Sequence, residues 1–222
     1  MDKTVVSLGG SIFAENMSSY LMNIINLFKR KESYAIVVGG GPIARERIDF
    51  LRRLGATEYH LDKMGIHATR LNAMTVSLAL GNSMEIPRTI DEAISILHEY
   101  GRVVMGGTEP GHTTDAVSVL LAEAYGADNV LNVTNVDSLY DRNPKLSGAK
   151  KIAGISYTEL INMITAEKRG AGANFPTDIL SLSIAMRSNI KIKILSYKDV
   201  NNISRALDGM SFEGTLISNV NE

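Results

Sequence analysis

Short apolar runs alternate along this chain with longer amphipathic segments. The short runs are rich in β-branched residues and show little polar alternation, which predicts strands buried on both faces of a parallel sheet. The expected strands are Thr4–Leu8, Ala35–Val38, Val103–Met105, Val130–Thr134 and Ile190–Leu195.

Apolar residues with a helical period predict helices between and after these strands. Thr89 with Glu92, and Ser156 with Glu159, have the spacing of capping boxes. In such a box the hydroxyl accepts from the amide of the acidic residue, and the carboxylate accepts from the amide of the hydroxyl residue. The alternation of strands and helices predicts an α/β fold, a three-layer sandwich around a central, mostly parallel sheet. The expected helices are Ser19–Lys31, Ala44–Leu54, Leu61–Leu80, Ile90–Tyr100, Asp115–Tyr125, Tyr157–Ile164, Asp178–Ser188 and Val200–Leu207.

Two segments do not fit a long element. Asn135–Lys150 is rich in Asp, Asn, Pro, Lys and Gly, which predicts a long loop or a hairpin. Thr165–Phe175 is expected to be mobile. Loops of this length in a compact domain are usually functional, and simple surface excursions are the alternative.

Composition narrows the class of protein. The 222 residues are expected to form a single domain, 1–222. The absence of cysteine excludes a disulfide framework and thiolate metal centres. A net charge of −1 disfavours a nucleic-acid partner. No apolar run approaches the about 18 residues that span a membrane, and the N-terminus lacks a signal-peptide pattern, so a cytoplasmic protein without a membrane partner is expected.

Glycines follow several predicted strands. Gly9–Gly10, Gly39–Gly41 and Gly106–Gly107 each come after an apolar run, and another run ends at Thr134. The carboxyl ends of parallel strands lie at one edge of the sheet, where open α/β proteins bind ligands. Exposed glycine amides and helix N-termini favour anions there. Any single glycine turn could be purely structural, but three together predict a phosphate-binding edge.

Two features supply candidate ligand contacts at this edge. Arg45 is expected in the first turn of a helix, where the dipole disfavours a cation, which favours phosphate binding over a solvated arginine. The segment Gly106–Asp115 consists mostly of small and hydrogen-bonding residues. Thr113 or Thr114 can cap the following helix. With His112 and the glycines they exceed what a cap requires, which predicts a phosphate or nucleoside pocket.

Several known motifs are absent or fit poorly. The chain has no P-loop, no Gly-x-Ser-x-Gly elbow and no His-Glu-x-x-His. Gly39–Ala44 matches the dinucleotide fingerprint, but Asp62 falls in a predicted helix rather than at a strand end. His60 and His67 are seven residues apart and make a poor metal site. No metal site built by protein side chains is therefore expected.

Motifs in chain order carry a family resemblance that covers nearly the whole sequence. They are Leu8-Gly-Gly-Ser11, Val37-Val-Gly-Gly-Gly41 with Ala44-Arg45, Leu61-Asp62-x-x-Gly65 with Thr69-Arg70-x-Asn72-Ala73, Met105-Gly-Gly-Thr-x-Pro-Gly-His-Thr-Thr-Asp115, and Thr134-Asn-Val-Asp-x-Leu-Tyr140-x-x-x-Pro144. Together they resemble the amino acid kinase family and, within it, the archaeal-type uridylate kinases.

The resemblance implies transfer of the ATP γ-phosphoryl group to UMP, giving UDP and ADP, in pyrimidine nucleotide biosynthesis. It implies Mg²⁺ bound with ATP, a homo-oligomer (a hexamer), and an N-terminal part that mainly holds UMP with a C-terminal part that mainly holds ATP. Asp115, which organises cationic groups near the transferred phosphoryl, and Arg45 would be catalytic.

The resemblance also distributes the binding contacts residue by residue. ATP would contact Gly10, Ser11, Gly41, Arg45, Thr134, Asn135, Tyr140 and Asn143. UMP would contact Gly40, Asp62, Thr108, Glu109, Pro110, Gly111, His112, Thr113 and Thr114.

Two positions depart from the family pattern. Ser7 stands where the family usually has a lysine, and the possible substitutes are Lys3, Lys63, Lys145 and Lys168. Asn143 stands where relatives usually carry aspartate. Two alternatives therefore stay open: another small-molecule kinase of the same fold, and a non-catalytic nucleotide-binding sensor or storage protein.

Overall fold

A computed structural model describes residues 3–14, 18–142, 147–167 and 175–219, and a seven-stranded sheet runs through them. The strand order is β3-β2-β1-β4-β8-β9-β7. The first five strands in this order are mutually parallel, β9 is antiparallel to β8, and β7 is parallel to β9. The expected mostly parallel sheet is confirmed. The strands are β1 (Thr4–Leu8), β2 (Tyr34–Val38), β3 (Arg102–Met105), β4 (Asn129–Thr134), β7 (Gly154–Ser156), β8 (Lys191–Ser196) and β9 (Thr215–Ser218).

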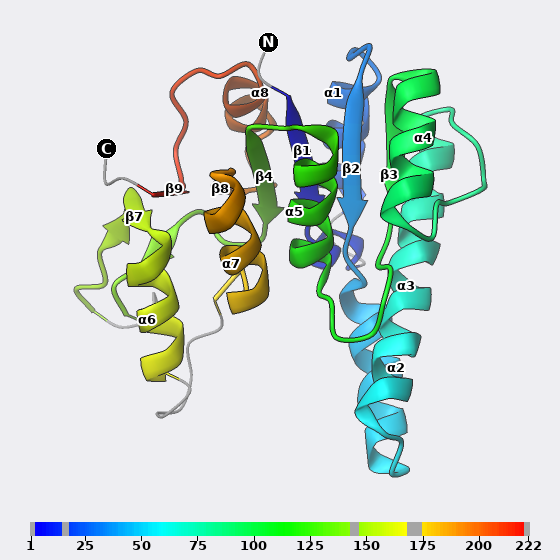
Figure 1. Cartoon of the computed structure of the whole chain (residues 1–222), viewed down its shortest axis with the longest axis horizontal. Helices are drawn as coiled ribbons and strands as arrows, with labels where there is room; N and C mark the ends of the chain where they lie inside the picture. Colours follow the sequence, from blue (N-terminus) through cyan, green and yellow to red (C-terminus); the bar gives the residue numbers. More distant parts are fainter. Residues whose placement is uncertain (1–2, 15–17, 143–146, 168–174, 220–222) are drawn as a thin grey trace.

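Helices cover both faces of the sheet, so the structure has three layers (Figure 1). One face packs against α1 (Ser18–Phe28), α3 (Glu58–Ala79) and α8 (Val200–Leu207). The other face packs against α4 (Ile90–Tyr100), α5 (Thr114–Tyr125), α6 (Tyr157–Glu167) and α7 (Ile179–Ser188). The remaining helices, α2 (Gly41–Arg53) and the short 3-10 helix η1 (Gly10–Phe13), follow the glycines after β2 and β1.

The apolar strands have no polar face because both of their faces are buried. In β1, Val5 packs into the cluster under α4–α7, whereas Val6 packs into the cluster under α1, α3 and α8. All five residues of β2 are buried. Strands in this position need apolar side chains throughout, which explains why they lack the alternation of a half-exposed strand.

Four strands lie outside the sequence prediction. β5 (Leu139–Tyr140) lies within Asn135–Lys150 and pairs antiparallel with β6 (Lys151–Ile152), directly after that segment, which agrees with the hairpin rather than the plain loop. β7 and β9 are 3 and 4 residues long. Runs this short carry too few positions for a hydrophobic period to be recognised.

Helix starts differ from the prediction in one important place. α2 begins at Gly41 rather than at Ala44, with Pro42 in its first turn, where its missing N–H costs no helical hydrogen bond. Arg45 consequently lies one residue beyond the first turn. The prediction that Arg45 occupies the first turn was wrong, and the dipole argument for its role weakens with it.

The two predicted capping boxes behave differently. Ser156 and Glu159 exchange both hydrogen bonds, at 3.0 and 3.2 Å, as expected. Thr89 accepts from the Glu92 amide at 3.1 Å, but the Glu92 carboxylate accepts from the Arg88 amide instead of the Thr89 amide. Only half of the second box is therefore formed.

The loops after β1 and β2 touch through their backbones. A Cβ atom on Gly10 would lie 2.1 Å from the Gly41 nitrogen, and one on Gly41 would lie 2.1 Å from the Gly10 oxygen. Gly41 also has a φ of +63°. Only glycine fits at these two positions, because any side chain would push the loops apart.

We predict that Gly10→Ala destabilises the protein by at least about 2 kcal/mol, since the added methyl group overlaps backbone atoms that cannot rotate away. For a chain of this size the melting temperature should fall by roughly 4–8 °C. Thermal unfolding followed by circular dichroism measures this change.

Gly65→Ala is the matched control. Gly65 lies inside α3, and an added Cβ would meet only the Ile48 Cδ1 atom, at 3.4 Å. Alanine also favours the helix over glycine, so the stability should stay equal or rise. Equal destabilisation by the two substitutions would contradict the backbone-contact argument.

Candidate active site

The predicted ligand-binding loops lie side by side along the carboxyl edge of the parallel strands. In sheet order they are Gly106–Gly107 after β3, Gly39–Gly41 after β2, Gly9–Gly10 after β1, and Thr134–Asn135 after β4. Backbone hydrogen bonds join neighbouring loops to the strands beside them: the Gly9 amide donates to Val133 O at 2.8 Å, and the Gly39 amide donates to Leu8 O at 2.9 Å. The sequence prediction of one shared edge is confirmed.

Helix α3 fixes the loops after β2 and β3 relative to each other. Asn72 Nδ2 donates to Gly39 O at 2.8 Å and to Gly40 O at 3.0 Å. Thr69 Oγ1 accepts from the Gly107 amide at 2.7 Å. Sequence reasoning gave these two buried side chains no role. The available signal was their position as polar residues within an otherwise apolar helix face.

The loop from Gly106 to Asp115 folds back onto α3. The Gly111 amide donates to Asp62 Oδ2 at 2.8 Å, so Asp62, an expected UMP contact, holds the loop. Gly111 needs its glycine because its φ is +82°. Thr108 is buried, Glu109 is exposed and Pro110 lies between these extremes.

Thr113 and His112 occupy the end of this loop, directly before α5. Thr113 is the N-cap, because its Oγ1 accepts from the Ala116 amide at 3.1 Å, so the capping interpretation is confirmed for it. Thr114 is the first residue of α5. His112 Nδ1 is buried and has no hydrogen-bond partner among the described residues, which is unusual for a buried polar atom.

Asp115, in the first turn of α5, lies over strands β1 and β4. Ser7 Oγ donates to Asp115 Oδ1 at 2.8 Å, and Asn132 Nδ2 donates to the same oxygen at 3.2 Å. Ser7 and Asn132 are register partners in neighbouring strands, which brings both donors to one point. Burial raises the pKa of Asp115 to about 7; the Ser7 hydrogen bond opposes this, and the charge of Asp178 adds to it.

Asp178 and Asn132 belong to this cluster, although sequence reasoning missed both. Asp178 is the N-cap of α7 and accepts from the Ser181 amide at 2.9 Å. Its other oxygen accepts from Thr113 Oγ1 at 2.5 Å, which joins the start of α7 to the start of α5. The role of Asp178 as a helix cap is enough to account for an aspartate at this position in the sequence. Only the packing of the start of α7 against the start of α5 shows that Asp178 lies near Asp115.

The expected cationic groups are not in contact with Asp115. Arg45 is exposed and makes no hydrogen bond or ion pair with the described residues. Lys3 precedes β1, at the opposite edge of the sheet, and donates to Tyr125 O at 3.2 Å, so it does not replace the family lysine. Lys63 lies 5.9 Å from the Tyr59 ring centre. Lys145 and Lys168 lie outside the described residues.

The expected ATP contacts come from two places. Gly10 and Ser11 begin η1 after β1, and Gly41 begins α2 after β2. Thr134 Oγ1, at the last residue of β4, lies 3.3 Å from Asn135 Oδ1. Tyr140 comes from the β5–β6 hairpin. Asn143 lies outside the described residues.

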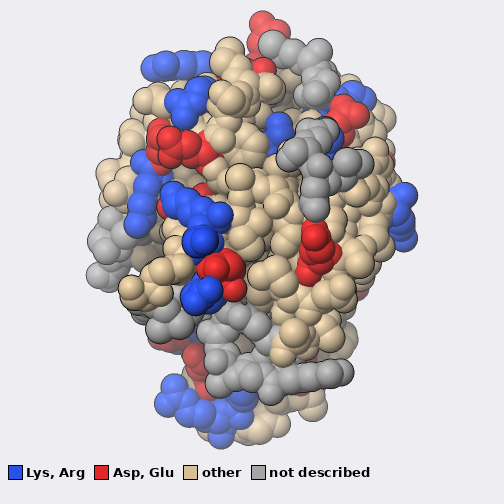
Figure 2. Space-filling view, turned by 90° about the vertical axis from the view of Figure 1, so that its left-hand side faces the viewer, with Lys and Arg blue, Asp and Glu red and all other residues tan. Residues whose placement is uncertain are grey.

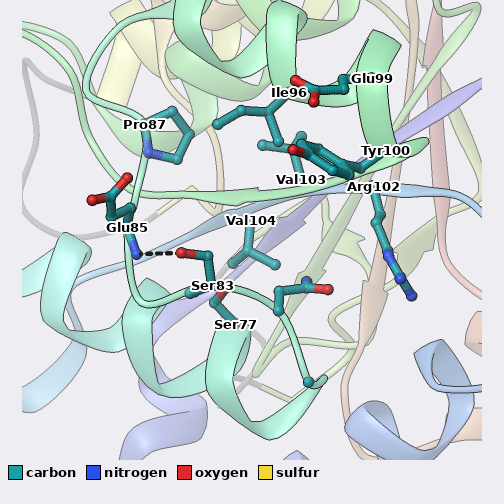
Figure 3. Close-up of a pocket in the computed structure, with 12 residues that line it drawn as sticks. Ser77, Ser83, Glu85, Pro87, Ile96, Glu99, Tyr100, Arg102, Val103 and Val104 are labelled. Atoms are coloured by element: carbon teal, nitrogen blue, oxygen red, sulfur yellow. Dashed lines mark hydrogen bonds between the residues drawn. The ribbon is translucent and has the colours of Figure 1, made fainter.

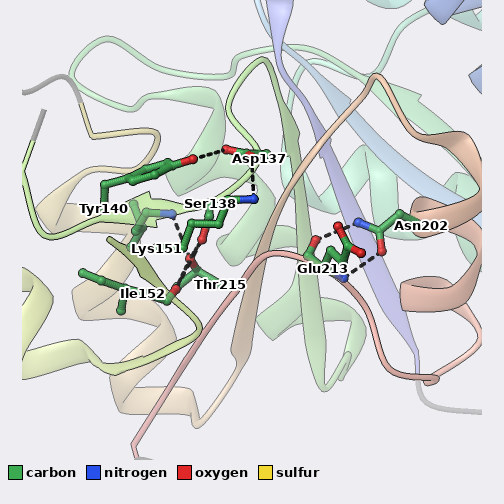
Figure 4. Close-up of polar contacts among 9 residues, drawn as sticks. Asp137, Ser138, Tyr140, Lys151, Ile152, Asn202, Glu213 and Thr215 are labelled. Carbon is green, nitrogen blue, oxygen red and sulfur yellow. Dashed lines mark hydrogen bonds and ion pairs between the residues drawn. The ribbon is translucent and has the colours of Figure 1, made fainter. Parts of the chain in front are cut away.

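Polar contacts hold the hairpin in place (Figure 4). Asp137 accepts from Tyr140 Oη at 3.0 Å and pairs with Lys151 Nζ at 2.8 Å. Partial burial opposes ionisation of Asp137, but these two contacts outweigh it and lower its pKa. Buried Thr215 of β9 donates to Ile152 O at 2.6 Å and accepts from the Leu139 amide at 2.8 Å, so the hairpin is anchored to the sheet.

A cavity of about 560 Å³ lies away from this edge (Figure 3). It is lined by the end of α3, the end of α4 and the start of β3, with Ser77, Tyr100 and Arg102 among its residues. Since Arg102 is the first residue of β3, this cavity lies toward the amino ends of the strands. It does not include the glycine loops.

The charges on one face of the molecule do not form a patch of a single sign. Figure 2 shows acidic and basic side chains interspersed on the face that carries β7 and α6. Among the described residues, no three His, Asp or Glu side chains gather in a way that could hold a metal ion. No helix in the described ranges is long and apolar enough to cross a membrane.

A parallel α/β sheet with glycine loops and a helix N-terminus at one edge is the architecture of a phosphate-binding protein. Residues 2–196 match the model of the amino acid kinase family. The chain is 44% identical to the uridylate kinase of Thermoplasma volcanium over 217 residues, which cover 94% of each protein. It is 40% identical to the uridylate kinase of Thermoplasma acidophilum, over 97% of this chain and 96% of that protein.

Solved structures agree with this family. The crystal structure of uridylate kinase from Archaeoglobus fulgidus superposes with a TM-score of 0.84 at 38% identity, over 97% of this chain and 100% of that one. UMP kinase from Bacillus anthracis, at 20% identity, shares the fold with a TM-score of 0.79 over 98% of this chain and 96% of that one. This chain belongs to the amino acid kinase family.

We predict that Asp115 makes folding stability fall as the pH rises from about 4 to about 7. Its carboxyl ionises near 3.8 when unfolded but near 7 when folded, so between these pH values the unfolded chain loses its proton first and is stabilised relative to the folded chain. Asp115→Asn removes this effect.

The measurement is urea unfolding of wild type and Asp115→Asn at pH 5 and pH 8. From pH 5 to pH 8, the free energy of unfolding of Asp115→Asn should rise by about 2–3 kcal/mol relative to that of wild type. Comparing the two proteins cancels the titration of all other groups. If the unfolding free energies of wild type and Asp115→Asn differ by the same amount at both pH values, Asp115 ionises at an ordinary pKa.

Proposed function

We propose that this protein is a uridylate kinase, which transfers the γ-phosphoryl group of ATP to UMP and forms UDP and ADP. The observation that carries the proposal is the continuous row of glycine loops, ending at the N-terminus of α5, along one sheet edge. Such a row offers many backbone amides to two phosphate-bearing ligands. The uridylate kinases that match over nearly the full chain support this choice of substrates.

UMP occupies the side of the edge formed by α3 and the loop after β3. The proposed contacts are Gly40, Asp62 and the segment from Thr108 to Thr114. Asp62 already orients the Gly111 amide, and the N-terminus of α5 attracts the UMP phosphate.

ATP occupies the side formed by the loops after β1, β2 and β4 and by the β5–β6 hairpin. Gly10, Ser11, Gly41 and Arg45 contact its phosphates, whereas Thr134, Asn135, Tyr140 and Asn143 hold its adenosine. The anchored hairpin supports this role, because Thr215 and Lys151 hold the segment that carries Tyr140. The proposed N-terminal UMP side and C-terminal ATP side of the domain, residues 1–222, follow from this division.

The chemistry requires alignment rather than a base. An oxygen of the UMP phosphate, already anionic near pH 7, bonds to the γ-phosphorus while the bond to the ADP oxygen breaks. The transition state is loose and its charge is spread over the migrating group, so positioned amides and cations stabilise it. Mg²⁺ enters as part of the MgATP substrate and neutralises phosphate charge, which requires few protein ligands.

The proposal also covers the oligomeric state of the protein and its metabolic role. Phe50 in α2, Leu54 directly after α2 and Tyr59 in α3 are 56%, 69% and 56% exposed. The end of α2 and the start of α3 project beyond the strands (Figure 1). Large apolar side chains left exposed in this way favour self-association. We therefore propose a homo-oligomer, a hexamer by family resemblance, that acts in cytoplasmic pyrimidine nucleotide synthesis.

We predict that the purified protein forms UDP from UMP, ATP and Mg²⁺, and that UMP outcompetes CMP and small phosphomonoesters in one assay. Chromatography of the nucleotide products measures both results. Turnover of another acceptor in preference to UMP would favour a different kinase of this fold. Tight binding of UMP and ATP without turnover would favour a nucleotide sensor.

We also predict that Arg45→Ala lowers kcat/KM by about 10-fold or more, because a charge-assisted hydrogen bond to phosphate is worth roughly 1.5–3 kcal/mol. Steady-state kinetics with varied ATP measure the loss.

Arg47→Ala is the matched control, since Arg47 lies on the same helix, is similarly exposed and pairs only with Glu46 among the described residues. Its kcat/KM should stay within about twofold of wild type, as expected for a surface pair. Equal effects of the two substitutions would remove Arg45 from the site.

A further inference from the structure

Asp115 is surrounded by neutral donors rather than by cations. Ser7 Oγ and Asn132 Nδ2 donate to it, and no described lysine or arginine lies within hydrogen-bond or ion-pair distance. The charged group in the described structure that contributes to the pKa of Asp115 is another carboxylate, Asp178 of α7, and it raises that pKa. A carboxylate placed among such neighbours is costly, and the protonated acid is not.

The two hydrogen bonds determine which oxygen can carry a proton. Both donors approach Oδ1, so this oxygen acts as the acceptor in either protonation state. Oδ2 accepts no hydrogen bond from a described residue, and Asp115 as a residue is partly exposed. A proton on Asp115 therefore sits on Oδ2, which is free to donate to a ligand.

Bound nucleotides strengthen this preference. Asp115 lies one residue after Thr114 at the N-terminus of α5, where the proposed function places the UMP phosphate. Two phosphate groups add negative charge near a carboxyl that already has Asp178 as a neighbour. Like charges disfavour ionisation, so substrate binding favours the acid over the carboxylate.

We propose that Asp115 works as a neutral carboxylic acid, which donates a hydrogen bond from Oδ2 to an oxygen of the transferring phosphoryl group. Ser7 and Asn132 are positioning residues that hold Oδ1 and so aim Oδ2. This role takes the place of the cation that the usual lysine at position 7 supplies, and it rests on the proposed kinase function.

No proton needs to move in this step. The bond from the UMP oxygen to the γ-phosphorus forms, the bond to the ADP oxygen breaks, and the proton stays on Oδ2 throughout. The groups that face Asp115 are Ser7 of β1, Asn132 of β4 and Asp178 of α7. Since Ser7 and Asn132 do not titrate, Asp178 is the acidic neighbour that faces Asp115 from the packed elements in the described structure.

The first test measures protons rather than turnover. Binding of UMP to wild type is followed by titration calorimetry at pH 8 in buffers of different ionisation enthalpy, with Asp115→Asn as the matched control. Wild type should take up close to one proton more than the variant. Equal proton uptake by the two proteins would overturn the proposal, whether or not the protein turns UMP over.

The second test compares two substitutions at Asp115. Asparagine keeps the shape and a donor group, so Asp115→Asn should retain kcat within about fivefold and lose the decline of activity at alkaline pH. Asp115→Ala loses the donor and should lower kcat by about 10-fold or more. If Asp115→Asn is as inactive as Asp115→Ala, the carboxylate form is the active one and the proposal is wrong.

Ser7→Ala separates positioning from simple structural support. The Ser7 hydroxyl stabilises the ionised form of Asp115, so its removal should move the alkaline limb of the kcat profile to higher pH. A purely structural role would lower activity at all pH values and leave the limb in place. If wild type has no kinase activity, the calorimetric test still decides the protonation of Asp115, which keeps this failure distinct from failure of the proposed function.

Discussion

The structure depends on the backbone contact between the loops that follow β1 and β2. Gly10 and Gly41 approach so closely that a Cβ atom on either would overlap the other. Because the strands are parallel neighbours, this contact sets how far apart the glycine loops lie and directs their amides toward the same space. α3 then fixes the adjoining loop through Thr69 and Asn72. A binding edge made of backbone needs such rigid support, since it has few side chains with which to adjust.

Polar side chains inside the apolar strands define the centre of this edge. Ser7 and Asn132 are buried polar residues between apolar ones, and both donate to Asp115, while Asn132 also donates to Pro176 O at 2.7 Å. Burying them would be unfavourable without that partner. Asp115 in turn is raised in pKa by burial, so the same packing that aligns the strands controls the protonation of the carboxyl. Ser7 stands where the family usually has a lysine, and instead of supplying a positive charge it donates a hydrogen bond to Asp115.

The sequence predicted the positions of the glycine loops and of one helix cap, but not the contacts between residues that are far apart in the chain. Glycine groups after apolar runs correctly indicated loops that meet at one edge of the sheet, because the chemistry of tight turns is local. Thr113 was correctly considered as a cap for the same reason. Asp178 was missed, since its local role as a cap gives no sign that it lies beside Asp115. Arg45 was placed too early in its helix, because Pro42 permits α2 to begin at Gly41.

The sequence by itself determined the alternation of strands and helices, the parallel sheet and the edge at which the loops meet. These features follow from hydrophobic period and glycine position, which act over a few residues. Only the tertiary structure decided that Ser7 and Asn132 share one carboxylate oxygen, that Asp62 holds the Gly111 amide, and that the hairpin is anchored by Thr215. Those contacts join residues far apart in the chain, and strand register and helix packing bring them together.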